Sequence, residues 1–236
     1  MGHCHNCQGA THVCASTVPI FASLGTSELL EINSLIQSAE YAKGELLFVE
    51  GDTSTHLYIV QSGQVKLYSV SPDGRQQILR ILKAGEFFGE LALFQETKQY
   101  CFAEAMEESS LCLLGQADFQ NLLQEKPSVA LALLQAMSAR LFQAERFIGD
   151  LTLKTVEERL ISWLLMKAQT GVKVHNGARI SLELSREELA HLLGTTIETV
   201  SRRLSSLQAE GLLTLSGHRS IVIRDLGRLE ALLARS

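Results

Sequence analysis

The sequence lacks the features of several large classes of protein. None of its apolar runs approaches the roughly 18 uninterrupted residues that a transmembrane helix requires. The first residues, Met1–His5, have neither the basic region nor the apolar region of a secretory signal, so we expect the chain to work in the cytoplasm. Its five cysteines are an odd number and are too few for a disulfide scaffold in 236 residues.

An excess of positive charge is also absent, because the formal net charge is −5 at pH 7. A broad nucleic-acid-binding surface is therefore disfavoured, and only a local basic patch remains open. Such a patch is predicted between Val200 and Arg224, where four arginines stand against the single acid Glu210. These arginines are Arg202, Arg203, Arg219 and Arg224.

Glycines punctuate short β-rich runs between about Tyr41 and Leu114. The runs 46–49, 57–60 and 65–70 follow one another at intervals of about ten residues. The segment Ser71–Gly74, with sequence SPDG, predicts a hairpin turn, because proline presets φ and glycine accepts a positive φ. Together these signals predict an all-β roll or sandwich.

A long helix is predicted after Pro127, because apolar residues recur there at alternating steps of three and four. We interpret this seam as the interface of a parallel homodimer; its residues are Leu134, Met137, Leu141, Ala144, Ile148 and Leu151. The alternative is a helix that lies on the core of its own domain. Four apolar residues off the seam are expected to supply that intramolecular face: Leu131, Leu133, Phe142 and Phe147.

Two short helices are predicted near the C-terminal end. Ser185–Glu188 is a capping box, in which the serine accepts from the third helical N–H and the glutamate reaches back. Gly194 ends this helix, and the segment from Thr195 to Glu198 starts a second helix in the same manner. The turn of about three residues between them is typical of a helix-turn-helix motif.

The second of these helices has a polar side that carries Glu198, Ser201 and Arg202. An arginine can contact guanine through two hydrogen bonds and a glutamate can accept from cytosine, so Glu198 and Arg202 suit neighbouring base pairs. The alternative is a surface ion pair between the two residues. Two β-like runs around residues 216–219 predict a wing, and we expect Arg203 and Arg219 to contact DNA as well.

These motifs resemble those of the CRP/FNR family of transcription regulators. The resemblance covers nearly the whole chain, and Phe88–Phe94, Pro127 and Glu157–Leu160 contribute to it. Its most specific part is the segment 187–202, in which Glu-x-x-Ser-Arg is the FNR-type version of the recognition motif.

The resemblance implies an α+β protein with four segments: a cysteine-rich N-terminal segment (1–20), a jelly-roll sensor domain like a cyclic-nucleotide-binding domain (21–126), a dimerisation helix (127–153) and a winged helix-turn-helix DNA-binding domain (154–236). It also implies that Glu198, Ser201 and Arg202 read palindromes with TTGA-like half-sites. DNA, a second copy of the chain and RNA polymerase are the partners that it implies.

Cys4, Cys7 and Cys14 resemble the cluster-binding segment of FNR, and Cys112 falls where that group has its fourth ligand. Four thiolates suit an iron–sulfur cluster, so we expect a cluster of the 4Fe–4S type as cofactor. Alternatively, a zinc site would combine Cys4, Cys7 and Cys14 with His3, His5, His12 or Cys112. A disulfide between Cys4 or Cys7 and Cys112 is a further alternative, and the cysteines can also be inert. We expect Cys101, in an apolar β run, to be inert.

Cyclic AMP is disfavoured as the effector. In CRP-like proteins an arginine and a serine hold the cyclic phosphate, and Tyr100 and Cys101 stand at those positions here. Gly89 and Glu90 are therefore interpreted as parts of the roll. A rival hypothesis gives the roll a small effector or haem. An enzyme, namely a thiol oxidoreductase using Cys4-x-x-Cys7, is disfavoured because no helix follows to activate that pair.

The mechanism we expect is that oxygen or another oxidant changes the state of the four-cysteine site. This change moves the N-terminal segment against the roll and shifts the dimerisation helix. None of the six seam residues is charged, and Ala144 stands where FNR has an acidic residue, so we expect a dimer that depends less on the cofactor than that of FNR.

Overall fold

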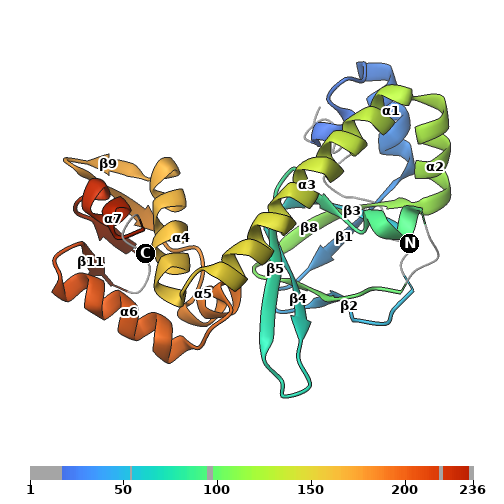
Figure 1. Ribbon diagram of the computed structural model, residues 1–236. Helices are drawn as coiled ribbons and strands as arrows, with labels where there is room; N and C mark the ends of the chain where they lie inside the picture. Colours follow the sequence, from blue (N-terminus) through green and yellow to red (C-terminus); the bar gives the residue numbers. More distant parts are fainter. Residues whose placement is uncertain (1–17, 54, 95–97, 218–219, 234–236) are drawn as a thin grey trace. The chain divides into compact units, whose positions relative to one another are not determined.

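The computed structural model of the chain describes residues 18–53, 55–94, 98–217 and 220–233 (Figure 1). The chain forms two compact units, Met1–Phe142 and Gln143–Ser236. The boundary falls inside helix α3 (Pro127–Leu153), which therefore contributes residues to both units.

Eight strands of the first unit form two four-stranded sheets. One sheet has the order β1-β8-β3-β6 and the other the order β2-β7-β4-β5, and all the pairs are antiparallel. The strands are β1 (Ile36–Tyr41), β2 (Leu46–Phe48), β3 (His56–Ser62), β4 (Gln64–Val70), β5 (Gln76–Lys83), β6 (Phe87–Phe88), β7 (Phe102–Ala105) and β8 (Ser109–Gly115). The roll predicted from glycine spacing is confirmed.

The turn between β4 and β5 is also as predicted. The N–H of Ser71 donates to the carbonyl of Arg75 at 2.9 Å, and the N–H of Gly74 donates back to the carbonyl of Ser71 at 2.8 Å. Gly74 has φ +82°, which a side chain would disfavour. The resulting hairpin extends beyond the neighbouring strands (Figure 1).

Strand β3 is buried on both faces, because its side chains alternate between two cores. Leu57 and Ile59 belong to a helix-side core, whereas Tyr58 and Val60 belong to an inter-sheet core. The buried members of the helix-side core are Val18, Ile20, Phe21, Ile32, Leu57, Ile59, Phe87, Cys112, Leu114, Phe119, Leu122, Val129 and Leu133. Those of the inter-sheet core are Phe48, Tyr58, Val60, Val65, Leu67, Leu82, Phe88, Cys101, Ala103 and Leu111.

Helices cover one face of the β1-β8-β3-β6 sheet and enclose the helix-side core. They are the short 3₁₀ turn η2 (Pro19–Phe21), α1 (Thr26–Leu35), α2 (Gln116–Glu125) and the first turns of α3, and η3 (Glu90–Leu93) follows β6. Phe119 of α2 and Ile32 of α1 are almost fully buried there. Burying a side chain of this size stabilises the fold by about 1.5–3 kcal/mol, so this core holds the helices on the roll.

The residues of the predicted seam of α3 differ in how exposed they are. Leu134, Leu141 and Ile148 are 61–66% exposed, whereas Met137 is half-buried against the helix-side core. The prediction that Leu131, Leu133, Phe142 and Phe147 would form the intramolecular face holds fully only for Leu133, which is buried. Leu131 and Phe142 are exposed, because they lie on the side of α3 turned away from the roll core.

The second unit contains the end of α3 and a small sheet with helices. Its sheet has the order β11-β12-β10-β9. The elements are α4 (Val156–Thr170), β9 (Val172–Val174), β10 (Gly177–Ser181), α5 (Arg186–Leu193), α6 (Ile197–Ala209), β11 (Leu213–Ser216), β12 (Ser220–Ile223) and α7 (Leu226–Leu233). Strands β9 and β10 and helix α7 were not predicted from the sequence. Among the described residues, no helix combines the length and apolar character needed to cross a membrane.

We predict that Gly89→Ala destabilises the roll by about 3 kcal/mol, because strain and overpacking add. Gly89 has φ +84°, and a Cβ atom there would lie 2.6 Å from the carbonyl oxygen of His56 and 2.9 Å from the ring of Tyr58. Gly74→Ala is the matched control: its φ is +82° and nothing lies within 4 Å of the added atom, so only the strain of about 1–2 kcal/mol is expected. Urea unfolding followed by circular dichroism measures both; equal losses would contradict the close packing at Gly89.

Candidate DNA-binding surface and cysteine site

Helix α5 begins and ends as its sequence predicts. The backbone N–H of Ser185 donates to Oε2 of Glu188 at 2.7 Å, and the N–H of Glu188 donates to Oγ of Ser185 at 3.1 Å. Gly194 adopts the left-handed conformation, and the N–H of Thr195 then donates to the carbonyl of Ala190 at 3.0 Å. These local bonds turn the chain out of α5 and into α6.

Helix α6 starts one residue later than expected. Its N-cap is Thr196, whose hydroxyl accepts from the N–H of Thr199 at 3.3 Å. The predicted box between Thr195 and Glu198 is wrong, because Glu198 lies in the first turn rather than three residues after the cap. The apolar side of α6 is fully buried and consists of Val200, Leu204 and Leu207.

The opposite side of α6 is exposed and carries Glu198, Ser201 and Arg202. Hydrogen bonds from the backbone N–H of Glu198 and from the Thr196 hydroxyl lower the pKa of the Glu198 carboxyl, so it is a carboxylate at neutral pH. Within the described part of the chain no ion pair joins Glu198 to Arg202. Both groups are therefore presented to solvent as separate hydrogen-bonding groups.

Arg203 is placed differently from these residues. Its Nη1 atom lies 2.9 Å from Oε2 of Glu157 in the first turn of α4. Both side chains are partly exposed, at 42% and 33%. Arg203 therefore forms an ion pair between two helices of the protein, and its contact with DNA stays a prediction.

A two-stranded wing follows α6. Gln208 of α6 accepts from the N–H of Leu215 in β11 at 2.8 Å, and Nε of Arg224 donates to Oγ1 of Thr214 at 2.8 Å. Arg219, predicted at the wing tip, lies outside the described residues. The wing is thus hydrogen-bonded to α6, and the exposed side of α6 lies next to the wing.

Both parts of the chain match known protein families. Residues 38–126 match the cyclic nucleotide-binding domain, and residues 158–232 match the Crp-like helix-turn-helix domain. A cyclic AMP receptor protein of Thermus thermophilus is 32% identical over 212 residues, which cover 90% of this chain and 95% of that protein. The chain belongs to the CRP/FNR family of transcription regulators. Its members bind DNA and act as dimers.

Other relatives of this CRP/FNR regulator span similar lengths. The probable transcriptional regulator flp of Lacticaseibacillus casei is 30% identical over 207 residues, covering 87% of this chain and 92% of that protein. The solved structure of a CooA mutant from Carboxydothermus hydrogenoformans has a TM-score of 0.78 at 26% identity and covers 92% of this chain and 95% of that one. FixK2 from Bradyrhizobium japonicum has a TM-score of 0.71 at 31% identity, with 84% and 96% covered. The predicted fold class is confirmed.

A charged cluster that the sequence did not predict lies on the roll of the regulator, at the end of β6. Nη1 of Arg140 in α3 lies 2.6 Å from Oε1 of Glu90, and Nη2 donates to the carbonyl of Phe87 at 2.6 Å. The guanidinium also lies 3.9 Å from the centre of the Phe87 ring. Arg80 of β5 is the second cation beside Glu90, at 3.9 Å. Glu90 therefore ties α3 to the roll, as expected for a structural role.

The two described cysteines are both buried. Cys112 of β8 belongs to the helix-side core, with its Sγ atom 3.8 Å from Oε1 of Gln61. Cys101 lies in the inter-sheet core, where burial raises the pKa of its thiol to about 11. Such a thiol is a poor nucleophile and metal ligand, as expected for an inert residue. Cys4, Cys7 and Cys14 lie outside the described residues.

We predict that Arg203 and Glu157 are energetically coupled by about 0.5 kcal/mol, the scale of a partly exposed ion pair. A double-mutant cycle on the unfolding free energy, with Arg203→Ala, Glu157→Ala and the double variant, measures this coupling. The coupling should shrink in high salt, because salt screens exposed charges. Strictly additive losses at low salt would show that the two side chains do not interact.

Proposed function

We propose that this regulator binds TTGA-like palindromes as a homodimer and responds to oxidants through Cys4, Cys7, Cys14 and Cys112. The exposed polar side of α6 is the observation that supports DNA binding. The lowered pKa of Glu198 keeps its carboxylate as an acceptor for a base amino group, and the exposed guanidinium of Arg202 suits guanine. Ser201, between them in sequence, offers a hydroxyl to either kind of base edge.

The exposed apolar residues of α3 support the homodimer. Leu134, Leu141 and Ile148 recur every seven residues and are each more than 60% exposed. Side chains of this kind that repeat along a helix are typical of a coiled-coil seam, which a second copy of the same helix would cover. Ala144, between them, is small and uncharged, so the seam does not need a cofactor to neutralise it.

The sensing part of the proposal is supported by the donor set and by the position of Cys112. Four thiolates suit an iron–sulfur cluster, which would supply a redox- and oxygen-sensitive centre when bound. Val18, four residues after Cys14 in the sequence, belongs to the same helix-side core as Cys112. Among the described residues no group of three or more potential ligands is found, so any such site depends on the N-terminal cysteines.

A zinc site, a disulfide switch and a small effector in the roll are the alternatives for the signal. In the roll, Tyr100 and Cys101 stand where CRP-like proteins have the phosphate-binding pair, and two arginines, Arg80 and Arg140, contact Glu90. Cyclic AMP is therefore disfavoured.

We predict that Arg202→Ala and Glu198→Ala each weaken binding to a TTGA-type palindrome by roughly tenfold to a hundredfold, since each base contact contributes about 1–3 kcal/mol. Fluorescence anisotropy at fixed salt measures the affinities. Arg228→Ala is the control, because Arg228 is an exposed arginine of the same unit, on α7. If Arg202→Ala lost no more affinity than Arg228→Ala, the assignment of α6 as the reading helix would fail.

We predict that Leu141→Glu converts the dimer to a monomer, because it places two charges in the seam. Analytical ultracentrifugation of the metal-free protein measures the mass. Leu30→Glu is the matched control, because Leu30 of α1 is 56% exposed and lies outside the seam. A wild-type protein that sediments as a monomer without its cofactor would contradict the prediction that this dimer depends less on the cofactor than that of FNR.

The sensor is tested by anaerobic purification followed by absorption spectroscopy and by iron, sulfide and zinc analysis before and after exposure to air. We expect about four irons per chain and a visible absorption that air abolishes. Cys112→Ser should remove them, whereas Cys101→Ser, the buried control, should not. A colourless protein with one zinc, or with no metal and two thiols lost in air, would assign the same residues to a zinc site or to a disulfide switch.

A further inference from the structure

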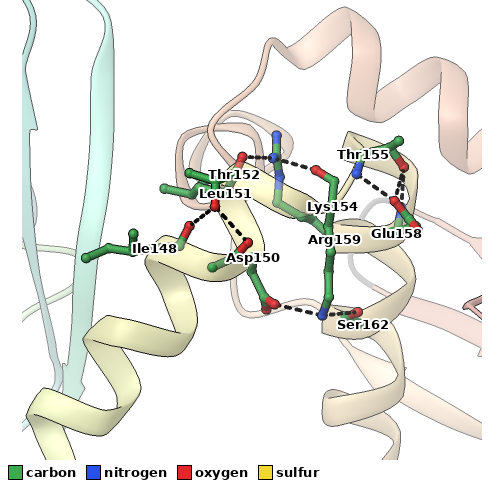
Figure 2. Close-up of polar contacts among 10 residues, drawn as sticks. Ile148, Asp150, Leu151, Thr152, Lys154, Thr155, Glu158, Arg159 and Ser162 are labelled. Carbon is green, nitrogen blue, oxygen red and sulfur yellow. Dashed lines mark hydrogen bonds and ion pairs between the residues drawn. The ribbon is translucent and has the colours of Figure 1, made fainter. Parts of the chain in front are cut away.

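Only Lys154 and Thr155 separate α3 from α4. A link of two residues between helices can act as a hinge unless contacts across it hold both ends. Figure 2 shows that such contacts surround this link, and all of them lie within the Gln143–Ser236 unit.

Arg159, in the first turn of α4, reaches back to the end of α3 (Figure 2). Its Nη1 atom donates to the carbonyl of Leu151 and to the carbonyl of Lys154, each at 3.0 Å. The last carbonyls of a helix have no partner inside the helix and carry its partial negative charge, so a guanidinium is suited to them. A single half-buried side chain thus binds the end of one helix to the start of the next.

Two further sets of contacts restrain the link itself. Nζ of Lys154 lies 2.8 Å from Oδ1 of Asp150 and 3.3 Å from Oγ of Ser162, so it bridges α3 and α4. The N–H of Thr155 donates to Oε2 of Glu158 at 2.6 Å, and the N–H of Glu158 donates to Oγ1 of Thr155 at 3.3 Å. This capping box fixes the direction in which α4 starts.

These contacts connect the seam with the reading helix. Leu151, whose carbonyl Arg159 holds, is itself a predicted seam residue, one helical turn after the exposed Ile148. Two residues before Arg159, Glu157 pairs with Arg203 of α6 at 2.9 Å. The first turn of α4 is therefore bonded to the end of the seam on one side and to α6 on the other.

We propose that Arg159 is a positioning residue that holds α6 in a fixed place relative to the dimer axis and thereby sets the spacing between the two DNA half-sites. The proposal rests on the palindrome-binding homodimer proposed above. In a twofold dimer the distance between the two reading helices determines the half-site separation that fits. If the α3–α4 junction is rigid, the packing of the two seams fixes the distance between the two α6 helices. If the junction is loose, each α6 could shift to follow its own half-site.

The test measures affinity for palindromes whose half-sites have the best spacing or are one or two base pairs closer or further apart. The wild-type protein should favour the best spacing by at least about tenfold, on the scale of one mismatched base pair. Arg159→Lys keeps the charge but loses the planar guanidinium that reaches both carbonyls, and it should reduce this preference to less than about threefold. Affinity for a single half-site should not change, because the exposed side of α6 is untouched.

Arg228→Lys is the control for the same exchange at an exposed position. Lys154→Gly is the second variant: it removes the lysine contacts and frees the link but leaves both Arg159 acceptors, and it should keep the spacing preference. A sharp preference in Arg159→Lys, or its loss in Lys154→Gly, would overturn the role of Arg159. If the wild-type protein bound no palindrome at any spacing, the proposed function would fail instead.

Discussion

Helix α3 has two kinds of contact surface, one for the roll and one that stays exposed, and the roll depends on how its residues divide between them. On one side Leu133 is buried in the roll, and Arg140 binds Glu90. On another side Leu134 and Leu141 remain exposed. An α-helix has 3.6 residues per turn, so residues three or four positions apart share a face. The 27 residues of α3 can therefore form both a buried face and an exposed apolar face, provided that the apolar residues of each face recur at this spacing.

The roll retains the framework of a nucleotide-binding domain while its charges serve the protein itself. Glu90 is held by Arg140 from α3 and lies near Arg80 from β5, so its carboxylate is engaged without any ligand. The Arg140–Glu90 ion pair thus binds the middle of α3 to the roll without a bound phosphate. Such a roll suits a regulator whose signal arises at another site, as in the cysteine proposal.

Local patterns predicted the helix-turn-helix well, because a cap such as Ser185 with Glu188 is decided within four residues. The glycine-spaced strands were equally visible. What the sequence could not predict were partners brought together by folding: Arg203 and Glu157 lie 46 positions apart, and only the packing of α6 near α4 makes them a pair. The same reason hid the contact of Arg140 with Glu90. The role of the N-terminal cysteines stays a prediction from their resemblance to the FNR segment.

The continuity of α3 constrains how this regulator can vary. Each residue of an α-helix adds about 1.5 Å and turns the chain by about 100°. One residue inserted near Phe142 would keep the helix intact but rotate the stretch from Ile148 to the Arg159 clamp out of phase with Leu134. Insertions or deletions of seven residues would nearly preserve that phase. We therefore expect this helix to tolerate length changes only in steps of about a heptad.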